Sequence, residues 1–146
     1  MGELTKIVLT ACVTLAGGVI LLIVTQVITR FIVDPLIDFR RLLGEVAYSL
    51  ILNSNLLYNA NATANTPEFQ EARRQCRALA SRLHAFSAAV PLYDILARIR
   101  LVPARTHVYD AARHLIGLSN TAANHPVNVV DQNYQRISQL LRIRVE

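Results

Sequence analysis

A long apolar run dominates the first part of the chain. No charged residue occurs from Ile7 to Thr29, a run of 23 positions between Lys6 and Arg30. As a helix this run would be about 34 Å long, and the hydrocarbon core of a bilayer is about 30 Å thick. The run is too long for the core of a signal peptide, and bulky residues follow it where a cleavage site would need small ones. The pattern predicts one transmembrane helix within residues 1–33.

Beyond residue 33 the apolar positions recur at helical spacing, and no segment alternates convincingly at the period of two that is typical of strands. We therefore expect an all-α protein, in which a single N-terminal transmembrane helix precedes a helical bundle over residues 34–146. Asp34-Pro35 offers a helix cap and a first-turn proline, which predicts a bend at the membrane surface. The bundle helices are expected over residues 35–58, 67–89, 91–99 and 103–118. A final helix is expected after Pro126, and it carries Val130, Tyr134, Ile137 and Leu140 or Leu141.

The helix over residues 35–58 is expected to be the most buried element of the bundle, with Leu43 and Leu50 on its inward face. The stretch from Asn53 to Thr66 is rich in asparagine and is typical of a loop or a frayed helix end. Thr66-Pro67-Glu68 then combines a capping residue, a proline and an acid in the order that predicts a helix start.

Basic residues set the expected orientation. Lys6 is the only lysine and precedes the apolar run, whereas Arg30, Arg40 and Arg41 follow it within reach of the lipid headgroups. The positive-inside rule predicts an external N-terminus and a cytoplasmic C-terminal domain in a bacterial inner membrane. The formal net charge of +5 also suits contact with anionic lipid or RNA, although a basic flank is ordinary for inner-membrane proteins.

One side of the apolar run carries small and hydroxyl residues, which share about one third of the helical circumference. Such residues let helices approach closely and hydrogen-bond across their contact. They indicate self-association as a dimer or as a ring, and in a ring the threonines and Gln26 would line a pore. The alternative is an ordinary membrane helix, in which glycine and threonine are common. The residues of this stripe are Thr10, Thr14, Gly17, Gly18 and Thr25.

Arg77 and His84 are the candidates for catalysis. They lie almost two helical turns apart and are expected to project from the same side, together with Arg73 and Ser81. An arginine followed at such a distance by a histidine is the loose signature of HEPN ribonucleases. In those enzymes the histidine supports acid–base chemistry on the RNA 2′-hydroxyl and the arginine stabilises the phosphate.

The signature is weakly specific, because arginine is frequent enough here for about one chance match. Arg100 and His107 form a second match, and Ala78 replaces the polar residue that often follows the motif arginine. We therefore expect a protein that is not an enzyme, with a HEPN-like ribonuclease as the minority interpretation. His107, Asp110 and His114 share a helix face but are spaced too widely for one metal ion. No metal, cofactor or small-molecule substrate is expected.

Several segments resemble a widespread group of small bacterial membrane proteins. The layout of an anchor followed by a divergent HEPN-like bundle is similar to that of the membrane accessory proteins of type VI-B CRISPR systems. This resemblance implies a ring-shaped homo-oligomer that forms a membrane pore and strengthens antiviral defence, with a CRISPR effector or RNA as partner. The segments that carry the resemblance are Asp34-Pro35-Leu36-Ile37-Asp38-Phe39-Arg40-Arg41, Gly44-Glu45-Val46-Ala47, Leu101-Val102-Pro103-Ala104-Arg105 and Leu115-Ile116-Gly117-Leu118-Ser119-Asn120.

Three functions follow from these patterns. The leading expectation is an oligomeric pore or channel-like accessory protein that acts through membrane permeability. A membrane-tethered HEPN-like ribonuclease and a non-enzymatic scaffold that docks a cytoplasmic partner at the membrane are the alternatives.

Overall fold

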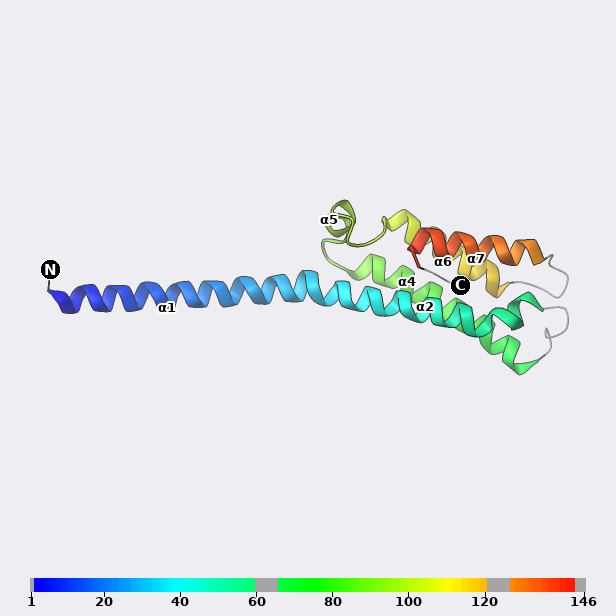
Figure 1. Cartoon of the computed structure of the whole chain (residues 1–146), viewed down its shortest axis with the longest axis horizontal. Coiled ribbons are helices and arrows are strands. Elements are labelled where there is room, and N and C mark those ends of the chain that lie inside the picture. Colours follow the sequence, from blue (N-terminus) through cyan, green and yellow to red (C-terminus); the bar gives the residue numbers. More distant parts are fainter. Residues whose placement is uncertain (1, 60–65, 121–126, 144–146) are drawn as a thin grey trace. The chain divides into compact units, whose positions relative to one another are not determined.

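A computed structural model describes residues 2–59, 66–120 and 127–143 of the 146-residue chain. These residues form helices joined by turns and short connections, and they contain no strand, as the sequence predicts. The chain divides into two compact units, Met1–Pro35 and Leu36–Glu146. Figure 1 shows the long helix of the first unit and the helical bundle of the second.

The first unit is built on helix α1, Glu3–Ile28. None of its residues is buried, and among the described residues it carries the one segment that is long and apolar enough to cross a membrane. Leu15 and Leu21, for example, are 71% and 69% exposed. Burying such a side chain is worth about 1.5–3 kcal/mol. Helix α1 therefore presents a long apolar surface that the described residues leave exposed.

A π-helical segment, Thr29–Val33, follows α1. The amide N–H of Asp34 donates to the carbonyl of Thr29, five residues back, and Asp34 has helical angles of φ −59° and ψ −51°. Pro35 has no amide hydrogen, and in a regular α-helix its ring would crowd the carbonyl four residues before it. The wider π turn relieves this conflict. Helix α2 begins at Asp34, one residue before the expected start, and Asp34 has helical angles, so it is not the capping residue that the sequence predicts.

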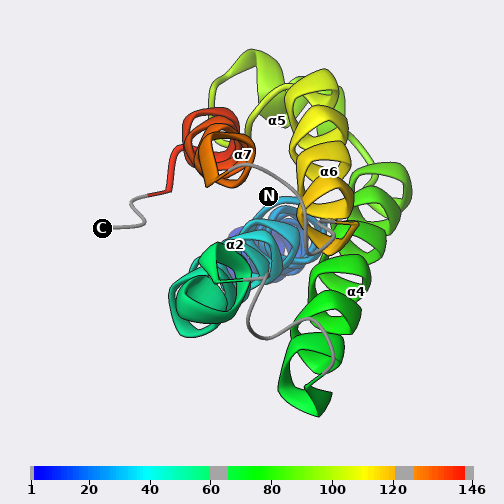
Figure 2. The same ribbon diagram turned by 90° about the vertical axis from the view of Figure 1, so that its right-hand side faces the viewer.

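The second unit contains four long helices and one short helix within its described residues (Figure 1). Figure 2 shows α6 between α4 and α7, with α2 on the remaining side of the interior. The bounds are Asp34–Tyr58 for α2, Pro67–Ala89 for α4, Tyr93–Arg98 for α5, Arg105–Ser119 for α6 and Val127–Leu141 for α7. The expected set of four main helices and a short one is confirmed over these residues.

Side chains from all four long helices fill the interior. The Phe39 ring of α2 packs on the Phe86 ring of α4, with centroids 5.2 Å apart. The Tyr134 hydroxyl of α7 donates to the carbonyl of Leu50 in α2 over 3.0 Å. The last two long helices contribute the buried apolar residues Val108, Ala111, Ala112, Leu115, Leu118, Val130, Tyr134, Ile137 and Leu141.

The prediction that Leu43 belongs to the core is wrong. Leu43 is half-buried, whereas its neighbour Leu42 is only 4% exposed. The helix is phased by Phe39, Val46 and Leu50, all almost fully buried, and this phase directs Leu42 inward. Apolar residues at two adjacent positions left the phase undetermined in the sequence.

Helix α2 ends at Tyr58, as the sequence predicts, so the asparagine-rich stretch begins as the last turns of the helix and not as a loop. Asn53 is 6% exposed, and its amide nitrogen donates to Ser49 Oγ over 3.2 Å and to Gln75 Oε1 of α4 over 3.0 Å. These bonds satisfy a polar group inside the bundle, so an asparagine fits within the helix. Residues 60–65 of the predicted loop lie outside the described part of the chain.

The predicted start of α4 is confirmed. The hydroxyl of Thr66 accepts a hydrogen bond from the amide of Phe69 over 3.3 Å, and Pro67 occupies the first helical turn. The short helix expected after Pro91 is present as α5.

Candidate functional site

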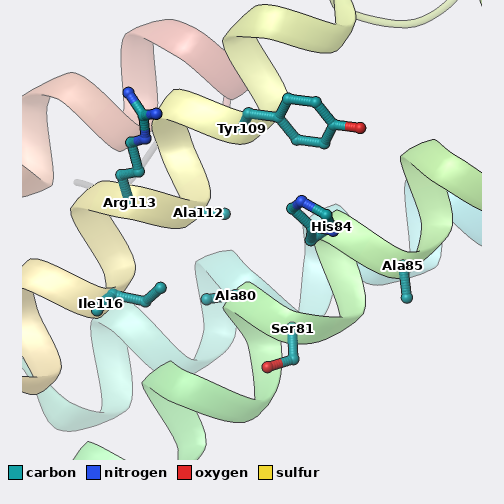
Figure 3. Close-up of a pocket in the computed structure, with 8 residues that line it drawn as sticks. All are labelled: Ala80, Ser81, His84, Ala85, Tyr109, Ala112, Arg113 and Ile116. Atoms are coloured by element: carbon teal, nitrogen blue, oxygen red, sulfur yellow. The ribbon is translucent and has the colours of Figure 1, made fainter.

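A shallow groove of about 410 Å³ lies between α4 and α6 and contains one of the two candidate catalytic residues, His84 (Figure 3). Helix α4 supplies one wall and α6 the other, because these two helices pack against each other. Most of the lining is apolar. The lining residues are Ala80, Ser81, His84, Ala85, Tyr109, Ala112, Arg113 and Ile116.

Within the groove, the rings of His84 and Tyr109 are stacked, with centroids 4.6 Å apart and planes inclined by 22°. Arg113 also lines the groove, but its guanidinium lies 3.6 Å from the carboxylate of Asp110, and its side chain extends away from His84 (Figure 3). No carboxylate lines the groove within the described residues. The groove therefore offers a stacked histidine without an acid partner or an arginine directed at the same point.

Arg77, the second candidate, contacts a different part of α6. Its Nε donates to Ser119 Oγ over 3.1 Å, and its Nη2 donates to Asn120 Oδ1 over 2.9 Å. Arg73, one turn earlier, donates to the carbonyl oxygen of Ser119. The last carbonyls of a helix have no intrahelical partner and carry partial negative charge. Two arginines of α4 therefore stabilise the C-terminal end of α6.

The structure thus separates the two residues of the expected signature. Both side chains reach α6, but Arg77 contacts its C-terminal end and His84 contacts Tyr109 near its middle. Joint action on one phosphate requires both groups at the same reacting centre. The geometry supports a structural role for Arg77 and an aromatic contact for His84.

The three polar residues that share one face of α6, His107, Asp110 and His114, have separate surroundings. His114 Nδ1 lies 2.8 Å from Asn133 Oδ1 of α7, at the contact between the two helices. Asp110 pairs with Arg113, and His107 is exposed. In the part of the chain that the structure describes, no three metal-ligating residue types cluster around one point.

The stripe on α1 is exposed along its whole length. Each threonine hydroxyl donates to the carbonyl four residues earlier: Thr10 to Lys6 over 2.9 Å, Thr14 to Thr10 over 2.9 Å and Thr25 to Leu21 over 2.8 Å. This bonding satisfies the hydroxyl protons in an apolar medium. At Gly17 and Gly18 an added Cβ would meet nothing within 4 Å, so the surface there is open to a neighbouring helix.

A polar hollow of about 580 Å³ lies at the C-terminal end of the first unit. It brings Thr25 of the stripe and Gln26, which is also expected to line a pore, together with Thr29, Arg30 and Asp34. The π-helical turn contributes to this grouping because it changes the angular positions of the residues that follow it. The hollow is thus a polar patch where the uncharged run ends.

Arg40 and Arg41, the other expected surface arginines, are exposed on the first turns of α2. Glu45, one turn further, pairs with Arg82 of α4. Neither Arg40 nor Arg41 forms an ion pair with another residue that the structure describes.

Burial shifts the titration of several bundle residues. It raises the pKa of the Cys76 thiol from 9.0 to about 11, and the pKa of the Tyr93 phenol from 10.0 to about 12. Burial also raises the pKa of Tyr134. The pKa of Tyr58 is raised by burial and by its hydrogen bond to Asp131. All four groups stay neutral at physiological pH, and Cys76 is therefore a poor nucleophile.

Sequence reasoning missed two features of this region. Tyr109, the partner of His84, has no recognisable motif around it, because a stack between two helices depends on their packing. The interaction of Arg73 and Arg77 with the end of α6 was missed for the same reason. The available signal was the spacing of Arg73 and Arg77, because residues four positions apart lie on the same side of a helix and can contact the same neighbouring helix.

Comparison of the chain with models of protein families, with curated proteins and with solved structures gives no match.

Proposed function

We propose that this chain is a single-span membrane protein that acts as a homo-oligomer, in which several copies of α1 enclose a pathway through the bilayer. The observation that carries the proposal is α1 itself, an apolar helix with no buried residue and a polar stripe on one side. One span cannot enclose a lumen, so a pathway requires several copies.

The surface of the stripe supports close helix contact. Gly17 and Gly18 leave room for a neighbouring backbone. The hydroxyl protons of Thr10, Thr14 and Thr25 are bonded within the helix, so these residues tolerate lipid while their oxygens still accept bonds from water in a lumen. The polar hollow with Gln26 and Arg30 would then lie at one mouth of the pathway.

The bundle supports assembly through a second surface. The outward side of α2 carries Tyr48, Ile51 and Leu52, which are 67%, 50% and 57% exposed. An exposed cluster of large apolar side chains is typical of a protein contact surface. A HEPN-like origin of the bundle and a role in antiviral defence belong to this proposal through the resemblance alone.

A membrane-tethered ribonuclease is the second candidate, and the groove that holds His84, Ser81 and Arg113 favours it. Tyr109 would offer a stacking surface for a base next to His84. Against it, Arg77 is engaged at the end of α6, and Asp110 neutralises Arg113.

Release of a dye from vesicles that contain the full chain tests the proposal. Thr14→Leu combined with Gly17→Leu fills the stripe, and we expect loss of the leak. Ala16→Leu combined with Val19→Leu adds aliphatic bulk to the opposite side of α1 and is the matched control, which should keep the leak. An equal effect of both pairs would contradict a pathway along the stripe.

The same preparation separates the two candidates. His84→Ala should leave the leak unchanged, because His84 lies in the bundle groove. Vesicles that stay sealed under every condition, together with RNA cleavage that His84→Ala abolishes, would replace the pore by the ribonuclease.

Orientation is tested independently. A reporter that is active only in the cytoplasm, fused after Glu146, should be active, because Arg30, Arg40 and Arg41 follow the span. Activity of a periplasmic reporter at the same place would reverse the topology.

A further inference from the structure

The region around α5 exposes a cluster of large aliphatic side chains, which we call the α5 tip. Its members are Leu92, Ile95, Ile99 and Leu101, whose exposed fractions are 51%, 56%, 56% and 42%. Four such residues within ten positions form an apolar patch on a bundle whose other aliphatic side chains are mostly inside.

The bundle holds the α5 tip in place. Tyr93 and Leu96, on the other side of α5, are 1% and 2% exposed, and the Tyr93 hydroxyl donates to the carbonyl of Pro103 over 2.9 Å. Leu92 and Arg100 bracket the helix in the left-handed backbone region, with φ of 60° and 61°. Bulky residues adopt this conformation only where the surrounding structure enforces it. The aliphatic side chains are therefore presented outward by a rigid support.

The α5 tip lies at the end of the bundle where α2 begins. Phe86, in the last turn of α4, packs on Phe39, in the first turns of α2. Only three residues separate the end of α4 from the start of α5, so α5 stays near Phe39. Figure 1 shows α5 at this end of the bundle, and it shows the start of α7 at the other end.

Positive charge surrounds the α5 tip. Arg98 and Arg100 are exposed and form no ion pair with another residue that the structure describes. Asp94, the acid of α5, is engaged by Arg105, with Nε and Oδ1 3.3 Å apart.

The first turns of α2 lie at the same end and are balanced in formal charge. Arg40 and Arg41 are exposed there, beside the exposed acids Asp34 and Asp38. Through Arg98 and Arg100, this end of the bundle thus combines an apolar patch with an excess of arginine.

We propose that the α5 tip inserts into the interfacial layer of the bilayer that α1 crosses, with Arg98 and Arg100 bound to anionic headgroup phosphates. Aliphatic residues beside arginines are the composition of a segment that lies in a membrane interface. Chain connectivity favours this occupant, because few residues separate Thr29, where the uncharged run ends, from Leu36, where the bundle begins. The inference rests on the part of the proposed function that makes α1 a membrane span.

Tryptophan fluorescence tests the inference in the full chain, which contains no tryptophan of its own. Ile95→Trp reports on the α5 tip, and Ile99→Trp is a second probe of the same patch. Val127→Trp is the matched control, because Val127 is 58% exposed at the other end of the bundle. Leu21→Trp reports on the span. Each variant is reconstituted into phosphatidylcholine–phosphatidylglycerol vesicles whose lipids are brominated near the headgroup end of the acyl chain.

We expect the brominated lipid to quench Ile95→Trp and Ile99→Trp by about twofold and to leave Val127→Trp almost unchanged. Quenching at the α5 tip should increase with the fraction of phosphatidylglycerol, and Arg98→Gln with Arg100→Gln should remove that dependence. If quenching of Ile95→Trp and Ile99→Trp does not depend on the phosphatidylglycerol fraction while both arginines are present, the role of the two arginines is overturned.

The remaining outcomes separate the inference from the proposed function. If Leu21→Trp is quenched while both α5 probes are not, the α5 contact is overturned and the span stands. If the α5 probes emit at short wavelength without quenching, a protein surface covers the tip, and the lipid contact is again overturned. If Leu21→Trp itself is not quenched, α1 does not enter the bilayer, and the span and the α5 contact both fail.

Discussion

Leu50 illustrates how single residues decide the interior of the bundle. It is 1% exposed, and its carbonyl accepts the Tyr134 hydroxyl from α7. Its burial could be predicted from spacing, because apolar residues recur on one side of α2. The choice between Leu42 and Leu43 could not, because it depends on the phase that packing imposes. The buried hydrogen bonds of the Asn53 amide could not be predicted either, because its partner Gln75 lies on another helix.

Replacing Leu50 by alanine should lower the free energy of unfolding by about 2–5 kcal/mol, because it removes a fully buried side chain and leaves a cavity. Ile37→Ala is the control, since Ile37 is 58% exposed on the same helix, and it should stay within about 0.5 kcal/mol of the parent. Urea unfolding of the full chain in mild detergent, followed by circular dichroism, measures both. Equal destabilisation by the two variants would contradict the assigned phase of α2.

At the scale of helices, the sequence predicted the existence and order of the bundle elements, because apolar spacing and proline-based starts are local signals. It did not predict the π-helical turn before Pro35, which relieves the crowding between the proline ring and the carbonyl four residues earlier. Nor did it predict which side of α5 faces outward, because Leu92, Tyr93, Ile95 and Leu96 are all apolar or aromatic. The contacts of the candidate site were the least predictable from the sequence, because they join residues of α4 to residues of α6.

The start of α4 gives a test at this scale. Thr66→Ala removes the hydroxyl that accepts the Phe69 amide hydrogen, and it should destabilise the bundle by about 1 kcal/mol. Thr66→Ser keeps an oxygen at the same position and should restore most of the loss. The midpoint of urea unfolding reports both variants. A serine variant as unstable as the alanine variant would show that the hydroxyl does not cap the helix.

At the scale of the whole molecule, alkaline pH should unfold the bundle. Folding raises the pKa of Cys76 to about 11 and that of Tyr93 to about 12, and it also raises the pKa of Tyr134. Between pH 9 and pH 12 the unfolded chain therefore loses protons that the folded chain keeps. The free energy of unfolding should be constant below about pH 9 and should then fall by about 1.4 kcal/mol per pH unit for each such group.

Urea unfolding of the detergent-solubilised chain at successive pH values measures this decline. Cys76→Val removes the group that titrates first in the unfolded chain, so the decline should begin about one pH unit higher, near the ordinary pKa of tyrosine. Stability that rises with pH above 9 in the parent protein would contradict the burial of these groups.

The central claim is that copies of a single-span chain assemble into one particle. The molar mass of the full chain extracted in mild detergent, with the detergent contribution subtracted, tests it most directly. One chain has a mass of 16.2 kDa. The account predicts a particle of several times that mass, which Thr14→Leu with Gly17→Leu reduces and Ala16→Leu with Val19→Leu leaves intact. A particle of 16.2 kDa at every protein concentration would contradict it, because one span cannot form a pathway through the membrane.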